Sequence, residues 1–175
     1  MEHELVKKEK MYLAGLQYHG AIKEEGTSIE QHIDELWSRF AEFCREEWDS
    51  IEKKVVDPEL SYEIQLWDRE ELEEEGKLQI FVGVEVEDLD ELPLELSGKV
   101  LPSSKYISFK LRGKEIKTWE EDILQGWFPE KDGYWIRSFE DTLFHVQCFH
   151  EERFKGVENL EESELQVLVP VEEVG

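Results

Sequence analysis

The sequence predicts an α+β fold of two similar βαββ units, with helices packed on an antiparallel sheet and a central ligand groove. One reason is that the order strand, helix, strand, strand occurs twice along the chain. A second is that LQIFVGVE at Leu78–Glu85 matches LQVLVPVE at Leu165–Glu172. Each unit is too small to bury its own sheet face, so the two are expected to pack about a pseudo-two-fold axis.

Both units are expected within one domain covering residues 1–175, the first over about 10–90 and the second over about 100–175. Ahead of each expected helix, YLAGLQYHG at Tyr12–Gly20 resembles KYISFKLRG at Lys105–Gly113. YEIQLWD at Tyr62–Asp68 is expected to correspond to YWIRSFE at Tyr134–Glu140. The offsets between matches differ, because loops tolerate changes of length better than strands do. The seam between such units is a natural place for a small-molecule site.

The composition is that of a folded, strongly acidic protein. Hydrophobic residues make up 39% of the chain, and 44 acidic against 20 basic residues give a net charge of -24. Such a surface repels nucleic-acid phosphates and anionic membranes, so no direct binding to either is expected. It attracts cationic molecules by long-range steering. No signal peptide or long apolar run is visible, which predicts a cytoplasmic protein with reduced thiols.

Neither the cysteines nor the histidines show the spacing of a metal site. Cys44 and Cys148 are far apart and belong to no C-x-x-C pattern. His145 and His150 are five residues apart, which suits neither a helix nor a strand as a metal pair. A P-loop, a dinucleotide fingerprint, HExxH and a serine nucleophile elbow are all absent from the sequence. We therefore expect no metal and no cofactor.

In the first unit, a short apolar strand is expected at Met11–His19, ending at Gly20. Thr27 and Glu30 form a capping-box pattern at the start of a helix that runs to about Trp48 with one apolar face. The following segments are then expected: a strand at Tyr62–Trp67, a solvated loop at Asp68–Lys77, a strand at Leu78–Val86 and an acidic connector at Glu87–Gly98.

The second unit is expected to repeat this order. It contains a strand at Lys105–Leu111, a helix at Ile116–Trp127, a strand at Tyr134–Glu140 and a last strand at Leu165–Val171. The segment Asp141–His150 either continues the preceding strand or forms a loop, and the pattern does not decide between them.

The stretch Trp127–Glu140 combines aromatic rings, among them Trp127, Tyr134, Trp135 and Phe139, with an acid at its end. A ring-rich wall with an anionic end suits a flat, apolar and often cationic molecule. Each ring can equally be ordinary core. An acid that closes an apolar strand must be paired, hydrogen-bonded or protonated if it is buried.

Several short motifs occur in a recognisable order in the second half: the strand Tyr106–Gly113, Trp119, WFP at Trp127–Pro129, Gly133-Tyr134, Phe139-Glu140 and VPV at Val169–Val171. No single motif is specific, but their order and spacing resemble the GyrI-like small-molecule-binding family. That family includes the effector-binding domains of AraC- and MerR-type multidrug regulators. The resemblance implies a double βαββ fold and a buried carboxylate, at Glu140, that pairs with cationic aromatic ligands. No helix-turn-helix precedes the domain, so a stand-alone member is expected.

Three functions stay open. The first is a stand-alone binding domain for hydrophobic, aromatic or cationic small molecules, serving drug or toxin sensing or sequestration. Its expected ligand contacts are Trp37, Trp67, Tyr106, Trp127, Tyr134, Phe139 and Glu140. The second, implied by the resemblance, is a hydrolase of cyclopropane-bearing genotoxic natural products that uses Glu140 to activate water, with Tyr134, Tyr106 or His145 as hydrogen-bond donor. The third is an acidic module that binds a protein partner, such as a gyrase inhibitor.

Overall fold

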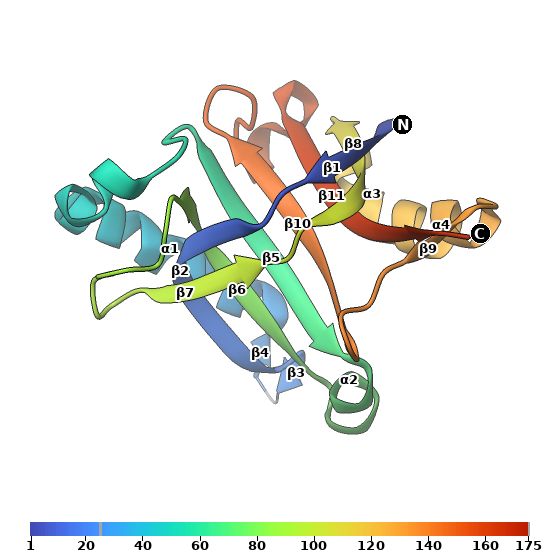
Figure 1. Ribbon diagram of the computed structural model, residues 1–175, viewed down its shortest axis with the longest axis horizontal. Coiled ribbons are helices and arrows are strands. Elements are labelled where there is room, and N and C mark those ends of the chain that lie inside the picture. Colours follow the sequence, from blue (N-terminus) through green and yellow to red (C-terminus); the bar gives the residue numbers. More distant parts are fainter. Residues whose placement is uncertain (25, 175) are drawn as a thin grey trace.

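A computed structural model of the protein describes residues 1–24 and 26–174 (Figure 1). Its main strands are β1 (Glu2–Lys8), β2 (Met11–Ala21), β5 (Leu60–Asp68), β6 (Lys77–Val86), β7 (Ser97–Leu101), β8 (Ser104–Arg112), β9 (Tyr134–Ile136), β10 (Thr142–His150) and β11 (Glu164–Glu173). A separate two-stranded sheet is formed by β3 (Lys23–Glu24) and β4 (Thr27–Ser28). The helices are α1 (Ile29–Glu47), η1 (Trp48–Ser50), η2 (Glu52–Lys54), α2 (Arg69–Glu75), α3 (Glu115–Trp119), the π-helix η3 (Glu120–Trp127), α4 (Phe128–Glu130) and η4 (Val157–Glu162).

The main sheet has nine strands in the order β1-β8-β11-β10-β5-β6-β2-β7, with β9 beside β11, and every pairing is antiparallel. In Figure 1, α1, α3 and α4 lie behind the central strands β5 and β10, while the edge strands β1 and β7 cross in front of the middle of the sheet. The expected α+β fold with an antiparallel sheet and helices packed on it is therefore confirmed. No helix in the described residues is both long and apolar enough to cross a membrane.

The two halves of the fold exchange their first strands. β1 precedes β2 in the chain but pairs with β8 of the second half, while β7 precedes β8 but pairs with β2 of the first. At the centre β5 and β10 run antiparallel, with Ile64 opposite Val146. The pseudo-two-fold axis therefore relates β5 to β10. This corrects the expected match of Tyr62–Asp68 with Tyr134–Glu140, because the true counterpart of β5 begins only at Thr142.

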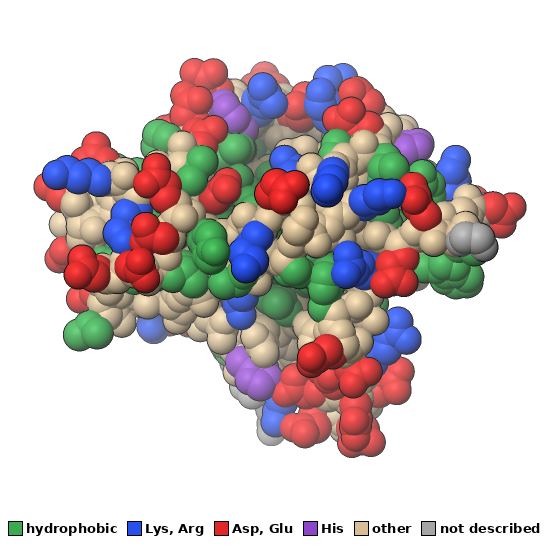
Figure 2. Space-filling view, in the orientation of Figure 1, with side chains coloured by type: hydrophobic (Ala, Val, Ile, Leu, Met, Phe, Trp, Pro, Cys, Tyr) green, Lys and Arg blue, Asp and Glu red, His purple; other side chains and the backbone are tan. Residues whose placement is uncertain are grey.

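Two strands of the main sheet, β1 and β7, and the helix α2 are among the elements that lie where the sequence predicts none. β1 and β7 are sheet edges with mostly exposed side chains, so they lack the apolar alternation that marks a strand. The expected loop Asp68–Lys77 contains α2, which begins where the Asp68 carboxylate accepts a hydrogen bond from the Glu71 backbone N–H at 2.9 Å. It ends at Gly76, which has a φ of +63°. Acidic side chains gather over this helix in Figure 2.

Other boundaries also differ from expectation. The start of α1 is shifted by one residue from the expected cap, because the Ser28 backbone N–H donates to the Gln31 side chain at 2.9 Å. The strand expected at Tyr134–Glu140 ends at Ile136. Phe139 and Thr142 then exchange two backbone hydrogen bonds across a tight turn, in which Glu140 has a φ of +58° and is exposed. The undecided segment Asp141–His150 is a strand for most of its length.

Three apolar cores hold this arrangement together. One lies between α1 and the β2/β6 side of the sheet, and a second lies between α3, η3 and α4 and the β8/β11 side. The third lies on the face of the sheet that the helices do not cover, next to the exchanged strands β1 and β7. β2 and β6 approach so closely at the facing pair Gly15 and Gly83 that a Cβ on Gly83 would lie 2.2 Å from the Ala14 carbonyl oxygen.

Candidate functional site

A polar stripe separates the two helix-covered cores. Ile64 in β5 and Val146 in β10 belong to the core on the opposite face. Because side chains alternate along a strand, Glu63 and Gln65 in β5 and the facing His145 and Gln147 in β10 point toward the helices. Polar side chains here form the floor of a groove that runs between α1 and α3.

A cavity of about 850 Å³ opens over one end of this floor, a size that suits a drug-like molecule. Its walls are mainly apolar and come from α1, the start of β5, the end of β10 and the segment that follows it. The apolar lining includes Ile33, Trp37, Phe40, Cys44, Trp48, Leu60, Ile116, Phe149, Phe154, Leu160 and Leu165. The charged lining comprises Asp34, Glu59, Glu63 and Glu151, and the described lining residues include no lysine or arginine.

Glu63 is the buried charge at the floor of this cavity, with only 5% of its surface exposed. The Trp37 indole N–H donates to one carboxylate oxygen at 2.8 Å. The side-chain amides of Gln147 and Gln65 donate to the other oxygen at 2.8 and 3.2 Å. All three donors are neutral, so they fix the orientation of the carboxylate without neutralising its charge.

The surroundings disfavour the ionised form of this carboxylate. Burial raises the pKa of Glu63, and the three hydrogen bonds only partly oppose that effect. The nearby charge of Asp34 raises it further. A cation that enters the cavity would reverse this balance, because an opposite charge at short range favours the ionised carboxylate.

His145 occupies the position that the pseudo-two-fold axis relates to Glu63. It is 2% exposed, and its Nδ1 has no hydrogen-bond partner within the described chain. The rings of Trp119 and Trp67 lie 4.8 and 5.5 Å from it, centroid to centroid. Burial lowers the pKa of His145 to about 3, so the ring is neutral at physiological pH. One half of the groove is therefore open and acidic, and the other is closed by Trp119 over a neutral histidine.

Trp37 is the one residue of the expected set that the described cavity lining includes, and it also binds Glu63. Trp67 is half-buried beside His145. Tyr106 is buried in the core of the opposite face, and its hydroxyl donates to the Pro102 carbonyl at 3.4 Å.

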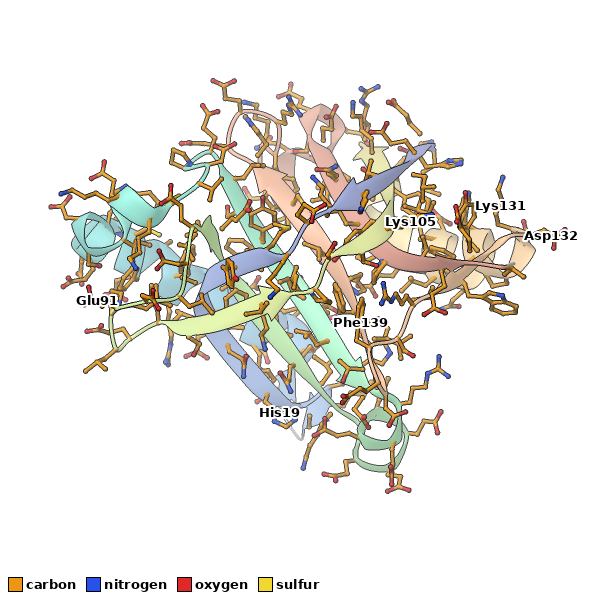
Figure 3. All side chains as sticks on the ribbon, viewed as in Figure 1. His19, Glu91, Lys105, Lys131, Asp132 and Phe139 are labelled. Atoms are coloured by element: carbon orange, nitrogen blue, oxygen red, sulfur yellow. The ribbon has the colours of Figure 1, made fainter. Side chains whose placement is uncertain are left out.

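The other expected residues lie in the second half, away from this cavity. Trp127 packs edge-on against Phe109 at 5.2 Å, and the ammonium of Lys131, labelled in Figure 3, lies 5.7 Å from its ring. Phe139, also labelled in Figure 3, lies on the connection between β9 and β10, and its ring centroid is 5.4 Å from that of Phe144.

Tyr134 and Glu140, the last two of the expected ligand contacts, also lie outside this cavity. Tyr134 is half-buried against the apolar core of the second half. Glu140 is exposed in its turn, so the buried carboxylate expected at this position is not found there. A buried carboxylate does exist in the fold, but at Glu63.

Glu63 and Phe149 were not among the residues expected from the sequence. The alternation of YEIQLW does place Glu63 and Gln65 on one strand face together with Trp67. An acid at an inward position of a strand is a usable signal, but only once that face is known to be covered. Phe149 belongs to a segment whose structure the sequence leaves undecided. No group of three or more His, Cys, Asp or Glu in the described residues is arranged to hold a metal ion.

Comparison with known proteins gives one family match and several similar folds. Residues 4–171 match the family model Cass2, described as integron-associated effector binding protein. The structure of SAV2435 bound to tetraphenylphosphonium is similar with a TM-score of 0.68 and 17% identity, over 98% of this chain and 94% of that one. A search of curated protein sequences found no match.

Two further solved structures share the fold. A Staphylococcus aureus protein described as a putative bacterial transcription regulation protein has a TM-score of 0.60 and 19% identity, over 98% of this chain and 99% of that one. An integron cassette protein from the mobile metagenome of Vibrio cholerae has a TM-score of 0.54 and 13% identity, over 97% of this chain and 95% of that one. At these identities the structural similarity establishes the fold alone.

Proposed function

The chain belongs to the Cass2 family of integron-associated effector-binding proteins, and from that membership we propose that it binds hydrophobic, cationic aromatic molecules in the cavity beside α1. Membership of an effector-binding family was the expectation from the sequence and is confirmed. In the proposed role the protein senses or sequesters a drug or toxin, and Glu63 is the charge partner of the ligand.

The observation that carries this proposal is the buried carboxylate of Glu63. A buried charge is costly unless an opposite charge compensates it. Glu63 has neutral hydrogen-bond donors on both oxygens and a cavity of ligand size above it. A bound cation would supply the missing charge, whereas a neutral or anionic ligand would leave it unpaired.

The aromatic walls supply the apolar part of recognition. Trp37 and Phe149 meet edge to face, with centroids 5.3 Å apart and an interplanar angle of 79°. Both line the cavity next to Glu63. A cation over such rings gains about 0.5–2 kcal/mol per contact, and burial of apolar surface adds to this. Together these contributions support affinity in roughly the micromolar range.

The class of ligand named in the SAV2435 structure, a phosphonium ion that carries four phenyl groups, agrees with this reading. Such an ion has its charge at the centre of an apolar shell and no hydrogen-bond donor. It would need a buried anion and aromatic walls, which are the two features that the cavity beside α1 combines.

Binding is favoured over hydrolysis by what surrounds Glu63. Activation of a water molecule by Glu63 needs an unoccupied lone pair on the carboxylate and a second acid or base nearby. Three hydrogen bonds already occupy three of the roughly four lone-pair sites of the carboxylate, and the described cavity lining contains no tyrosine that could serve as the second group. His150 also lines the cavity, but its Nε2 lies 3.5 Å from a carboxylate oxygen of Glu59, which precedes β5 and is four residues before Glu63.

Tryptophan fluorescence provides the test, because Trp37 and Trp48 both line the cavity. Titration with tetraphenylphosphonium is expected to change the emission with a dissociation constant of roughly micromolar order. Triphenylphosphine oxide, which has three of the same rings and no net charge, is expected to bind at least about tenfold more weakly. Equal affinity for the two molecules, or no spectral change with either, would refute the proposal.

A further inference from the structure

β1 is a free edge of the main sheet. It pairs on one side with β8, and no other strand of the described chain pairs with its outer side. The same register continues from the β1/β8 pair into the β2/β7 pair, because Lys8 faces Ser104 and Met11 faces Leu101. Along β2 the outer side is covered by β6, but along β1 it stays open. The outward backbone groups of β1 are therefore available to a further strand.

Leu5, at the middle of β1, is a hydrophobic side chain at this open edge. It faces Ile107 of β8, which belongs to the core between the sheet and the helices α3, η3 and α4. Nevertheless 42% of the surface of Leu5 is exposed. A strand added beside β1 would cover Leu5 and extend that core by one row of side chains.

The charges along β1 make the strand complementary to itself. Glu2 and Glu4 lie in its first half, and Lys7 and Lys8 lie in its second half. When two copies run antiparallel about a two-fold axis at Leu5, Glu2 of each copy faces Lys8 of the other. Directly opposite residues have Cβ atoms about 4.5–5.5 Å apart, so both pairs are within reach of each other. A parallel pairing would instead set like charges side by side.

This complementarity is unusual for so acidic a protein. A net charge of -24 makes most of the surface repel a second copy of the chain. Within the described chain Lys7 and Lys8 form no ion pair, so both remain available to a partner. Glu2 has a long contact of 3.7 Å with Lys110, and both side chains are exposed.

A hollow of about 520 Å³ beside the first half of β1 offers a second contact. Its lining includes three acids, Glu121, Asp122 and Glu130. Trp127 also lines it, and the His3 ring lies 5.1 Å from the Trp127 ring, centroid to centroid. In the antiparallel pair, Lys7 of the second copy is opposite His3 and therefore on the same face. Its ammonium group then lies on the side of the acids of the hollow.

We propose that the partner of this edge is a second copy of the chain, which pairs β1 with β1 antiparallel about an axis at Leu5. Such a two-fold contact is closed, so assembly ends at the dimer. One short strand from each copy makes a small interface, so we expect a weak dimer with a dissociation constant of roughly 10–100 µM. The described lining of the cavity beside α1 includes no residue of β1, so both copies keep that cavity open.

Sedimentation equilibrium in physiological salt, from about 10 µM to about 1 mM protein, is expected to show monomer and dimer. Glu2→Lys and Lys8→Glu each place like charges opposite each other in both pairs and should weaken the dimer at least about tenfold. An equimolar mixture of these two variants regains both pairs of opposite charge and should dimerise within about threefold of the unmodified protein. The controls Glu42→Lys and Lys53→Glu make the same charge changes at exposed positions outside β1 and should change the dissociation constant by less than about threefold.

Leu5→Cys tests the position of the axis. Two copies of residue 5 would have Cβ atoms about 4.5–5.5 Å apart, close to the separation in a disulfide, so mild oxidation should give a covalent dimer. The matched control is Val100→Cys on β7, the other free edge, because Val100 is 44% exposed and Leu5 is 42% exposed. The unmodified protein, with its free Cys44 and Cys148, gives the background.

Four results would overturn the proposal. One is an unmodified protein that stays monomeric up to about 1 mM. Another is a mixture of the two charge-reversed variants that dimerises no better than either variant alone, because the charges of β1 would then not face each other. Equal weakening in the controls would assign the effect to net charge. Cross-linking through Val100→Cys as efficient as through Leu5→Cys would mean that the contact is not centred on β1.

Discussion

Replacing Glu63 by glutamine removes the buried charge with little change in shape. The fold is expected to tolerate this substitution. The glutamine carbonyl can accept from the Trp37 indole, and the Gln147 and Gln65 amides can rotate to present their oxygens to the new NH₂ group. Because burial disfavours the ionised form of Glu63, the free energy of unfolding of Glu63→Gln at pH 7 should be equal to or above that of the unmodified protein.

The effect on binding should be large. Two unit charges about 4 Å apart attract by about 4 kcal/mol at an effective dielectric constant of 20. Part of this is offset because the cation loses its hydration on entering the cavity. Loss of one partner of a buried charge pair typically costs 2–5 kcal/mol, so we expect about 2–3 kcal/mol for Glu63→Gln. The affinity for tetraphenylphosphonium should therefore fall by roughly 30- to 150-fold.

Calorimetry with three proteins and two ligands measures this effect. The unmodified protein, Glu63→Gln and the control Glu42→Gln are titrated with tetraphenylphosphonium and with neutral triphenylphosphine oxide. Glu42 is an exposed acid on α1 outside the cavity lining, so its removal should change cation affinity by less than about threefold. The reasoning is refuted if Glu63→Gln binds the cation as well as Glu42→Gln does, or if it loses both ligands equally.

Three more predictions concern pH and packing. Because the pKa of Glu63 is raised above its ordinary value of 4.5, cation affinity should weaken as pH falls through that raised pKa, and cation binding should release protons, which calorimetry in two buffers detects. An affinity that does not change with pH down to 4.5 would contradict this. The pKa of His145 is lowered from 6.5 to about 3, so the stability it contributes is fully present above pH 6.5 and is lost as pH falls toward 3. Urea titrations of His145→Leu should therefore show a smaller loss of unfolding free energy over that pH range than the unmodified protein shows, and parallel pH profiles would argue against this. Gly83→Ala places a Cβ 2.2 Å from the Ala14 carbonyl oxygen and should lower the free energy of unfolding by more than about 2 kcal/mol. In Gly98→Ala the new Cβ meets only the flexible Leu89 side chain, at 3.0 Å, so the loss should be smaller, and equal losses would refute the packing argument.

The sequence was sufficient to predict the elements whose pattern is local. β6 and β11 are apolar runs with β-branched residues, and α1 has one clear apolar face, so both kinds of element were predicted near their observed bounds. The pattern failed for β1, an edge strand whose side chains are mostly exposed. An edge strand of this kind is held by pairing with a distant segment, here β8, and that pairing leaves no local trace.

The site was harder to predict because it depends on long-range register. The aromatic segment Trp127–Glu140 has the residue types of a ligand wall, yet Trp127 packs on Phe109 and Glu140 ends in an exposed turn. Glu63 becomes a floor residue only because β5 pairs with β10 and α1 lies over one side of that pair. The alternation of β5 gave its orientation, but neither its strand partner nor the open space above it could be obtained from sequence.

The central claim is that a cation binds over Glu63 between the aromatic walls of the cavity beside α1. A crystal structure of the protein with tetraphenylphosphonium tests this most directly. The account predicts a ligand inside the cavity, one phenyl group against Trp37 and Phe149, and the Glu63 carboxylate facing the phosphonium centre. A ligand bound on the opposite face of the sheet, or one inside the cavity with its charge directed away from Glu63, would contradict it.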